Sequence, residues 1–93
     1  MIKSFSHKGL KAYYESQNLS KIEPTHQNRL RTILTVLKHA TSLNDIDLQG
    51  FDLHILKKPP YKGYYAIKVT GSWRVIFQYS DGNVYKLDYM NYH

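Results

Sequence analysis

Residues 67–78 read IKVTGSWRVIFQ, in which two runs of alternating apolar and polar side chains flank a short turn. Apolar side chains stand at positions 67 and 69 before the turn and at 75 and 77 after it. A period of two is typical of strands that bury one face. Gly71 and Ser72 suit a tight hairpin, so the segment predicts two antiparallel strands.

The same period continues on both sides of this hairpin. Upstream, Leu53 and Ile55 alternate with His54, and downstream Leu87 lies between two charged residues. Residues 80–83 (SDGN) predict a second tight turn. If residues 84–93 form one regular strand, Tyr85 shares a face with the other odd-numbered residues, and Leu87 anchors that face on the core. We therefore expect four strands in an antiparallel meander.

The first half of the chain has the period of helices instead. Residues 2–5 predict a short strand, and residues 7–17 predict a helix with one apolar side. Pro24 suits the first turn of a second helix, where its missing N–H is not needed. That helix is expected to end near residues 40–42. Its apolar face follows the i, i+3, i+4, i+7 spacing at Leu30, Ile33, Leu34 and Leu37.

Together these elements predict one α+β domain over residues 1–93, with two helices on one face of an antiparallel sheet. The predicted order is β-α-α-β-β-β-β. If the apolar side chains of the strands face the helices, then His54, Lys68, Arg74 and Gln78 face the other way. We therefore expect the second face to be basic and open, with Trp73 at the edge of the core.

The chain is basic, because 13 Lys and Arg against 7 Asp and Glu give a net charge of +6. Such an excess favours a nucleic acid or an acidic protein as the partner. The 9 Tyr, among them Tyr61, Tyr64 and Tyr65, add surface on which unpaired bases can stack, although most are expected to pack.

The same composition excludes several classes of protein. No Cys is present, which excludes disulfides and thiolate chemistry. The sequence has neither a signal-peptide pattern nor an apolar run long enough to span a membrane. We therefore expect a soluble protein of the cytoplasm.

His54 is the first candidate for chemistry. Its imidazole can exchange a proton near neutral pH, and the ammonium groups of Lys57 and Lys58 can hold a phosphate nearby. Arg74 and Lys68 lie on the same predicted face, where a guanidinium can grip a phosphate with two parallel hydrogen bonds. A surface histidine among solvated cations is the alternative interpretation of these residues.

The last residues, DYMNYH at 88–93, supply further candidates. Tyr92 can stack on a base and His93 can exchange a proton, unless the end of the chain is only a loose tail. Nucleotide-binding, zinc-protease and nucleophile-elbow motifs are absent from the sequence. An acid–base site without metal or cofactor then fits best. Such groups suit RNA cleavage, in which the 2′-OH supplies the nucleophile.

Six segments, taken together, resemble the HigB branch of the RelE-like toxins, also called the plasmid maintenance killer protein family. They are IKSF at 2–5, HKGL at 7–10, GFDLHILK at 50–57, GYY at 63–65, SWRVIF at 72–77 and DYMNYH at 88–93. The resemblance implies a RelE-like fold, similar to that of microbial ribonucleases. It also implies a bacterial toxin of a type II toxin–antitoxin pair that cuts mRNA in the ribosomal A site.

The resemblance also implies particular partners and particular active-site residues. The partners are a HigA-type helix-turn-helix antitoxin, the ribosome with its rRNA, and mRNA. Carried over by position, the active site consists of His54, Lys57, Arg74, Tyr92 and His93. The implied mechanism is metal-independent: one imidazole, or a tyrosine acting with it, takes the 2′-OH proton, and the other imidazole protonates the leaving oxygen. Which imidazole does which stays open.

Two further residues of these segments are Asn91, near the end of the chain, and His7, near its start. Asn91 stands where family members often have an acidic residue, so it can orient a neighbour by hydrogen bonding but cannot accept a proton. His7 falls within the N-terminal motif, and we interpret it as structural.

Two other functions fit the same sequence. The related ParE toxins share this arrangement of helices and sheet but inhibit DNA gyrase, and His54 together with Tyr92 and His93 favours the nuclease over that class. In the other function, the chain is a non-catalytic basic module that binds RNA or its antitoxin. A gyrase supercoiling assay tests the first, and growth arrest by His54→Ala tests the second.

Overall fold

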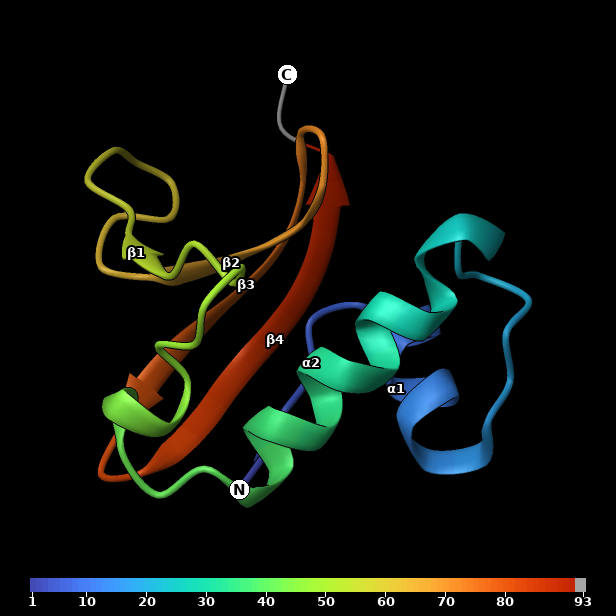
Figure 1. Cartoon of the computed structure of the whole chain (residues 1–93), viewed down its shortest axis with the longest axis horizontal. Coiled ribbons are helices and arrows are strands. Elements are labelled where there is room, and N and C mark those ends of the chain that lie inside the picture. Colours follow the sequence, from blue (N-terminus) through green and yellow to red (C-terminus); the bar gives the residue numbers. More distant parts are fainter. Residues whose placement is uncertain (92–93) are drawn as a thin grey trace.

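The structure, a computed structural model, describes residues 1–91. Its elements are α1 (Lys8–Ser16), η1 (Pro24–His26), α2 (Gln27–His39), η2 (Leu43–Asp45), β1 (His54–Ile55), β2 (Tyr65–Thr70), β3 (Trp73–Ser80) and β4 (Asn83–Asn91), where η denotes a 3₁₀ turn. The sheet has the order β1-β2-β3-β4 with antiparallel neighbours, and both helices lie on one side of it (Figure 1). The predicted α+β arrangement is confirmed.

The N-terminal segment contributes less to the sheet than its sequence predicts. In place of a strand over residues 2–5, two isolated parallel bridges join Ile2 to Val84 and Phe5 to Leu87 of β4. His7 then caps α1, because its Nδ1 accepts a hydrogen bond of 2.9 Å from the backbone N–H of Leu10. This contact satisfies one of the donors left unpaired at a helix start, which agrees with a structural role for His7.

The second helix begins one turn later than expected. Pro24 opens the turn η1, and α2 follows from Gln27. The predicted apolar face is buried in full, at Leu30, Ile33, Leu34 and Leu37. Beside that face, the guanidinium of Arg29 donates to the carbonyls of Gly50 at 2.6 Å and Lys68 at 2.8 Å. Arg29 therefore ties α2 to β2 and to the segment that precedes β1.

Both predicted hairpin turns are present. Gly71 and Ser72 join β2 to β3, and Asp81 and Gly82 join β3 to β4. Asp81 and Gly82 have φ angles of 51° and 81°. Two consecutive residues of positive φ give the hairpin turn whose twist matches the flanking strands, so this turn sets the pairing of β3 with β4 next to it, where Ser80 pairs with Asn83.

The main core lies between the helices and one face of the sheet. Ile67, Val69, Val75 and Phe77 are buried there, as their alternation predicts. Trp73 is half-buried against the same core.

Ile55 departs from this pattern, because it is 45% exposed where the alternation predicts burial. Leu53, two residues earlier, is half-buried against the core. The strand β1 has only two residues and pairs with β2 at the sheet edge, away from the helix layer (Figure 1). Alternation gives the two faces of a strand, but it does not tell whether a second layer still covers one of them.

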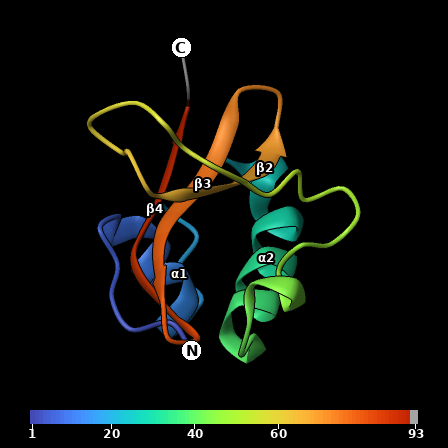
Figure 2. The same cartoon turned by 90° about the vertical axis from the view of Figure 1, so that its left-hand side faces the viewer.

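The face away from the helices is only partly open, which corrects the sequence-based expectation. Ala66 and Ile76 point to this side and are fully buried at 0% exposure, yet they do not belong to the main core cluster. The chain between η2 and β2 passes in front of this face (Figure 2). A small second area of burial therefore occupies its centre, and the polar residues surround it.

A bulge in β4 changes which side chains face the core. The β3–β4 register shifts between Ile76 and Gln78, and Lys86 has a φ of 53°. One extra residue reverses the alternation beyond it, so the buried residues of β4 are Val84, Leu87 and Tyr89. The expectation that Tyr85 shares a face with Leu87 is therefore wrong, and no local pattern marks the bulge.

Candidate active site

His54 lies on β1 with its side chain exposed. Its Nδ1 is 2.8 Å from the backbone carbonyl of Asp52. A carbonyl oxygen can only accept, so Nδ1 carries the hydrogen of this bond and the neutral ring has its lone pair on Nε2. The contact fixes both the tautomer and the orientation of the ring, with Nε2 as the atom that can take a proton.

A groove of about 880 Å³ opens beside this imidazole. It lies between the segment that begins with β1 and the end of β4. Its lining consists of His54, Ile55, Leu56, Lys57, Lys58, Pro59, Pro60, Tyr61, Met90 and Asn91. The structure thus brings together four residues singled out from the sequence, namely His54, Lys57, Lys58 and Asn91. The volume is within the usual range of ligand sites.

Lys57 and Lys58 are exposed in a loop that backbone hydrogen bonds close at its base. The N–H of Leu56 donates to the carbonyl of Tyr64 at 2.7 Å, and the N–H of Gly63 donates to the carbonyl of Leu56 at 2.8 Å. These bonds continue the β1–β2 pairing past Ile55. Both ammonium groups are therefore carried on a defined frame next to His54.

Arg74 lies on the same face of the sheet, where it pairs with Lys68 and Met90 in the neighbouring strands. Contrary to expectation it is half-buried. Its Nη1 donates to the carbonyls of Gly71 at 2.6 Å and Trp73 at 2.9 Å, and its buried Nε has no partner within residues 1–91. Neither Arg74 nor the exposed Lys68 lines the groove, and their contact with phosphate stays a prediction.

Asn91 is held by a residue that the sequence analysis missed. The hydroxyl of Ser72 donates to Oδ1 of Asn91 at 2.6 Å, and Trp73 pairs with Asn91 between β3 and β4. Only the strand register, which the sequence does not state, brings this turn to the end of β4. Tyr92 and His93 lie outside the described residues, so their roles stay predictions from the sequence.

A buried cluster of rings under the end of β4 was also missed. His26 is 2% exposed, and its Nδ1 forms a hydrogen bond with the hydroxyl of Tyr89. Trp73 stacks on Tyr89 at 4.9 Å between ring centroids and meets His26 edge-on at 5.0 Å. Burial raises the pKa of the Tyr89 hydroxyl, and a hydrogen bond from the backbone of Glu23 partly offsets this. The cluster fixes the adjoining ends of β3 and β4.

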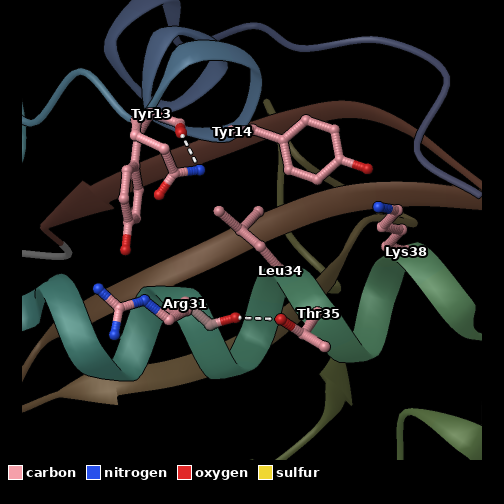
Figure 3. A pocket seen from close by; sticks show the side chains of 7 residues that line it. Tyr13, Tyr14, Arg31, Leu34, Thr35 and Lys38 are labelled. Atoms are coloured by element: carbon pink, nitrogen blue, oxygen red, sulfur yellow. Dashed lines mark hydrogen bonds between the residues drawn. The ribbon is translucent and has the colours of Figure 1, made fainter.

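A second hollow, of about 170 Å³, lies between α1 and α2 on the other side of the sheet (Figure 3). The buried Tyr13 and Leu34 and the half-buried Tyr14 line it, with the exposed Arg31 and Lys38. Like the groove it combines cations with aromatic rings, but no histidine lines it. Its side chains offer no group suited to proton transfer near neutral pH, so it is the weaker candidate for catalysis.

No group of three or more His, Asp or Glu side chains within residues 1–91 is placed to hold a metal ion. No helix in this part of the chain is long and apolar enough to cross a membrane. The expectation of an acid–base site without metal stays a prediction.

Comparison with known proteins places these features in a family context. Residues 3–93 match the family of HigB-like toxins, described as RelE-like toxins of the type II toxin–antitoxin system HigB. The chain is 38% identical over 93 residues to endoribonuclease HigB of Proteus vulgaris, with 100% of both chains covered. Its fold is similar to the crystal structure of YafQ from E. coli strain BL21(DE3), with a TM-score of 0.63 and 20% identity over 98% of this chain and 91% of that one.

Proposed function

The chain belongs to the HigB-like toxins, which are RelE-like toxins of type II toxin–antitoxin systems, and we infer that it is an endoribonuclease whose active site is the groove beside His54. Its 38% identical relative carries the name endoribonuclease HigB. The family resemblance proposed from the sequence is confirmed. The assignment of the groove and of its residues is our proposal.

The observation that carries this assignment is the state of the His54 ring. Its Nδ1–H is used by the Asp52 carbonyl at 2.8 Å, so Nε2 is the proton acceptor of the neutral ring. The ring lines the same groove as Lys57 and Lys58. A proton acceptor with cations beside it is what RNA cleavage by the 2′-OH requires.

The proposed reaction proceeds through the substrate's own hydroxyl. Nε2 of His54 takes the 2′-OH proton, the 2′ oxygen attacks the adjacent phosphorus, and the bond to the 5′ oxygen breaks. Lys57 stabilises the negative charge of the phosphorane, and Arg74 joins it once its guanidinium turns from the β2–β3 turn. We assign the proton for the departing 5′ oxygen to His93 and base stacking to Tyr92, on the sequence motif alone.

We further propose that cleavage needs the ribosome. The basic groove has room for a short stretch of RNA, but a domain of 93 residues is too small to carry an extended sequence-reading module beside this groove. A ribosome would present single-stranded mRNA in the A site and add rRNA phosphates for the cationic surface. Primer extension on one mRNA, with and without active translation, tests this. We expect cuts in the translated mRNA and negligible cutting of the free RNA; equal rates on both would contradict ribosome dependence.

A toxin of a type II system has an antitoxin as its partner. We propose an acidic HigA-type helix-turn-helix protein, because the +6 charge of the toxin favours rapid association with an acidic surface. We expect this antitoxin to bind away from the groove and to block entry into the ribosome, and we place the complex in the cytoplasm. A structure of the complex with antitoxin residues between His54 and Arg74 would contradict this mode of inhibition.

A further inference from the structure

The groove beside His54 has an apolar wall that proton transfer and phosphate binding do not use. Of its ten lining residues, six have apolar or aromatic side chains: Ile55, Leu56, Pro59, Pro60, Tyr61 and Met90. Ile55 remains 45% exposed although it stands directly beside the catalytic candidate His54. Exposed apolar surface within a ligand groove is suited to a flat, weakly polar group.

Tyr61 is the aromatic ring of this wall, and its neighbours hold it in place. It is half-buried, and its ring meets that of Tyr64 at 5.2 Å between centroids with an interplanar angle of 71°. In such an edge-to-face contact, Tyr64 covers at most one face of the Tyr61 ring. The backbone N–H of Tyr64 also donates to the carbonyl of Tyr61 at 2.9 Å. Tyr61 is thus held in place while it lines the groove and keeps part of its surface accessible, so a ligand in the groove can contact it.

The positions of the cations make an RNA base the partner that fits. Lys57 and Lys58 lie between His54 and Tyr61 along the loop. The sugar–phosphate chain of a single strand can follow the two ammonium groups, while its unpaired bases turn toward the apolar wall. Recognition of single-stranded RNA commonly uses this combination of cations for the backbone and aromatic rings for the bases.

We propose that Tyr61 is a base-binding residue, on which one unpaired base next to the cleaved bond stacks and so sets where the RNA is cut. The inference rests on the proposed endoribonuclease function and adds to it a subsite for a base. Tyr61 holds the substrate and takes no part in proton transfer. The ring, not the hydroxyl, is the part that acts.

Three variants separate this role from a structural one. Tyr61→Leu keeps an apolar side chain but removes the aromatic face, Tyr61→Phe keeps the face and removes the hydroxyl, and Tyr14→Leu replaces a half-buried tyrosine in the hollow between the helices. Two quantities are measured for each: kcat/KM on ribosomes programmed with mRNA, and binding of a short single-stranded RNA made uncleavable by 2′-O-methyl groups. The melting temperature of each variant shows whether it is folded.

We expect Tyr61→Leu to lower both quantities about 5- to 150-fold, the range for loss of one stacked base, and to redistribute the cleavage positions mapped by primer extension. Tyr61→Phe and Tyr14→Leu should stay within about twofold of wild type in both quantities. Wild-type values for a folded Tyr61→Leu protein would overturn the inference and leave the proposed function intact. If the wild type does not cut translated mRNA, the proposed function fails. The binding measurement still tests the base subsite in that case, and equal RNA binding by the wild type and Tyr61→Leu would decide against it.

Discussion

One histidine is buried on the helix side of the sheet, in η1, and another is exposed on β1, and the two rings are used in different ways. On the helix side, His26 is 2% exposed and its Nδ1 is bonded to the Tyr89 hydroxyl, inside a cluster of packed rings. On the other side, the exposed His54 uses Nδ1 for the Asp52 carbonyl and keeps its lone pair on Nε2. A ring surrounded by packed partners serves stability, whereas an oriented ring in an open groove can serve chemistry.

The same contrast separates the two hollows of the molecule. Both the groove and the hollow between α1 and α2 combine cations with aromatic rings. Figure 3 shows Leu34 at the centre of the latter, with Arg31 toward Tyr13 at one end and Lys38 toward Tyr14 at the other. Positive charge alone would therefore not identify the active site of this basic chain. The imidazole does, because it occurs in the lining of the groove and not in that of the other hollow.

Replacing the exposed histidine, His54, gives the largest expected effect, a loss of cleavage rate. His54→Gln should lower the rate of mRNA cleavage by about 10²- to 10⁴-fold, the usual contribution of a positioned general acid or base. His93→Gln, at the position that the sequence motif assigns to the second imidazole, should do the same and abolish growth arrest. His54 is exposed, so His54→Gln should change the free energy of unfolding by no more than about 0.5 kcal/mol. Primer extension on translated mRNA and a thermal melt measure the two quantities.

His26→Gln is the matched control and should behave in the opposite way. It disrupts the hydrogen bond to Tyr89 and the ring contact with Trp73, so it should lower stability by about 1–3 kcal/mol and leave the cleavage rate per folded molecule near that of wild type. Full activity in His54→Gln would remove the groove from consideration as the active site. Full growth arrest by His93→Gln would instead leave the chemistry to His54 and the cations.

The elements of this fold could be predicted from local sequence, because each depends on neighbours a few positions away. The i, i+3, i+4, i+7 spacing gave the buried side of α2, and Gly71-Ser72 and Asp81-Gly82 gave both turns. The errors concern relations between distant parts. The exposure of Ile55 and the path of the chain before β2 depend on which layer covers a strand, and the bulge at Lys86 depends on the register between β3 and β4.

The residues of the candidate site also fall into two groups, those that could be predicted from the sequence and those that could not. His54, Lys57 and Lys58 are close together in the sequence, so their chemistry could be noticed before their positions were known. Ser72 could not be found, since its bond to Asn91 depends on the register of β3 and β4. The bond between His26 and Tyr89 spans 63 positions of the chain, and no pattern in the sequence connects them.

Removing the Tyr89 hydroxyl tests the buried ring cluster on the helix side with a smaller change than His26→Gln. Tyr89→Phe leaves the stacked ring in place but deprives the buried Nδ1 of His26 of its hydrogen-bond partner. An unsatisfied buried polar atom costs about 1–3 kcal/mol. We therefore expect a fall in melting temperature of roughly 4 °C or more, since 1 kcal/mol corresponds to about 4–8 °C in a chain of this size. Thermal melts followed by circular dichroism measure it, and cleavage should be little changed.

Tyr79→Phe is the counterpart with the smallest expected effect, because here the hydroxyl is buried and has no partner within residues 1–91. Removing it should leave stability unchanged or raise it by about 1 kcal/mol or less. Burial raises the pKa of the folded Tyr79 hydroxyl, with a smaller contribution from the charge of Asp45. The unfolded chain therefore ionises first as the pH rises past about 10, and stability is lost there. Tyr79→Phe should lose less stability than wild type in alkaline solution; a loss at neutral pH as large as that of Tyr89→Phe would show that the Tyr79 hydroxyl is satisfied after all.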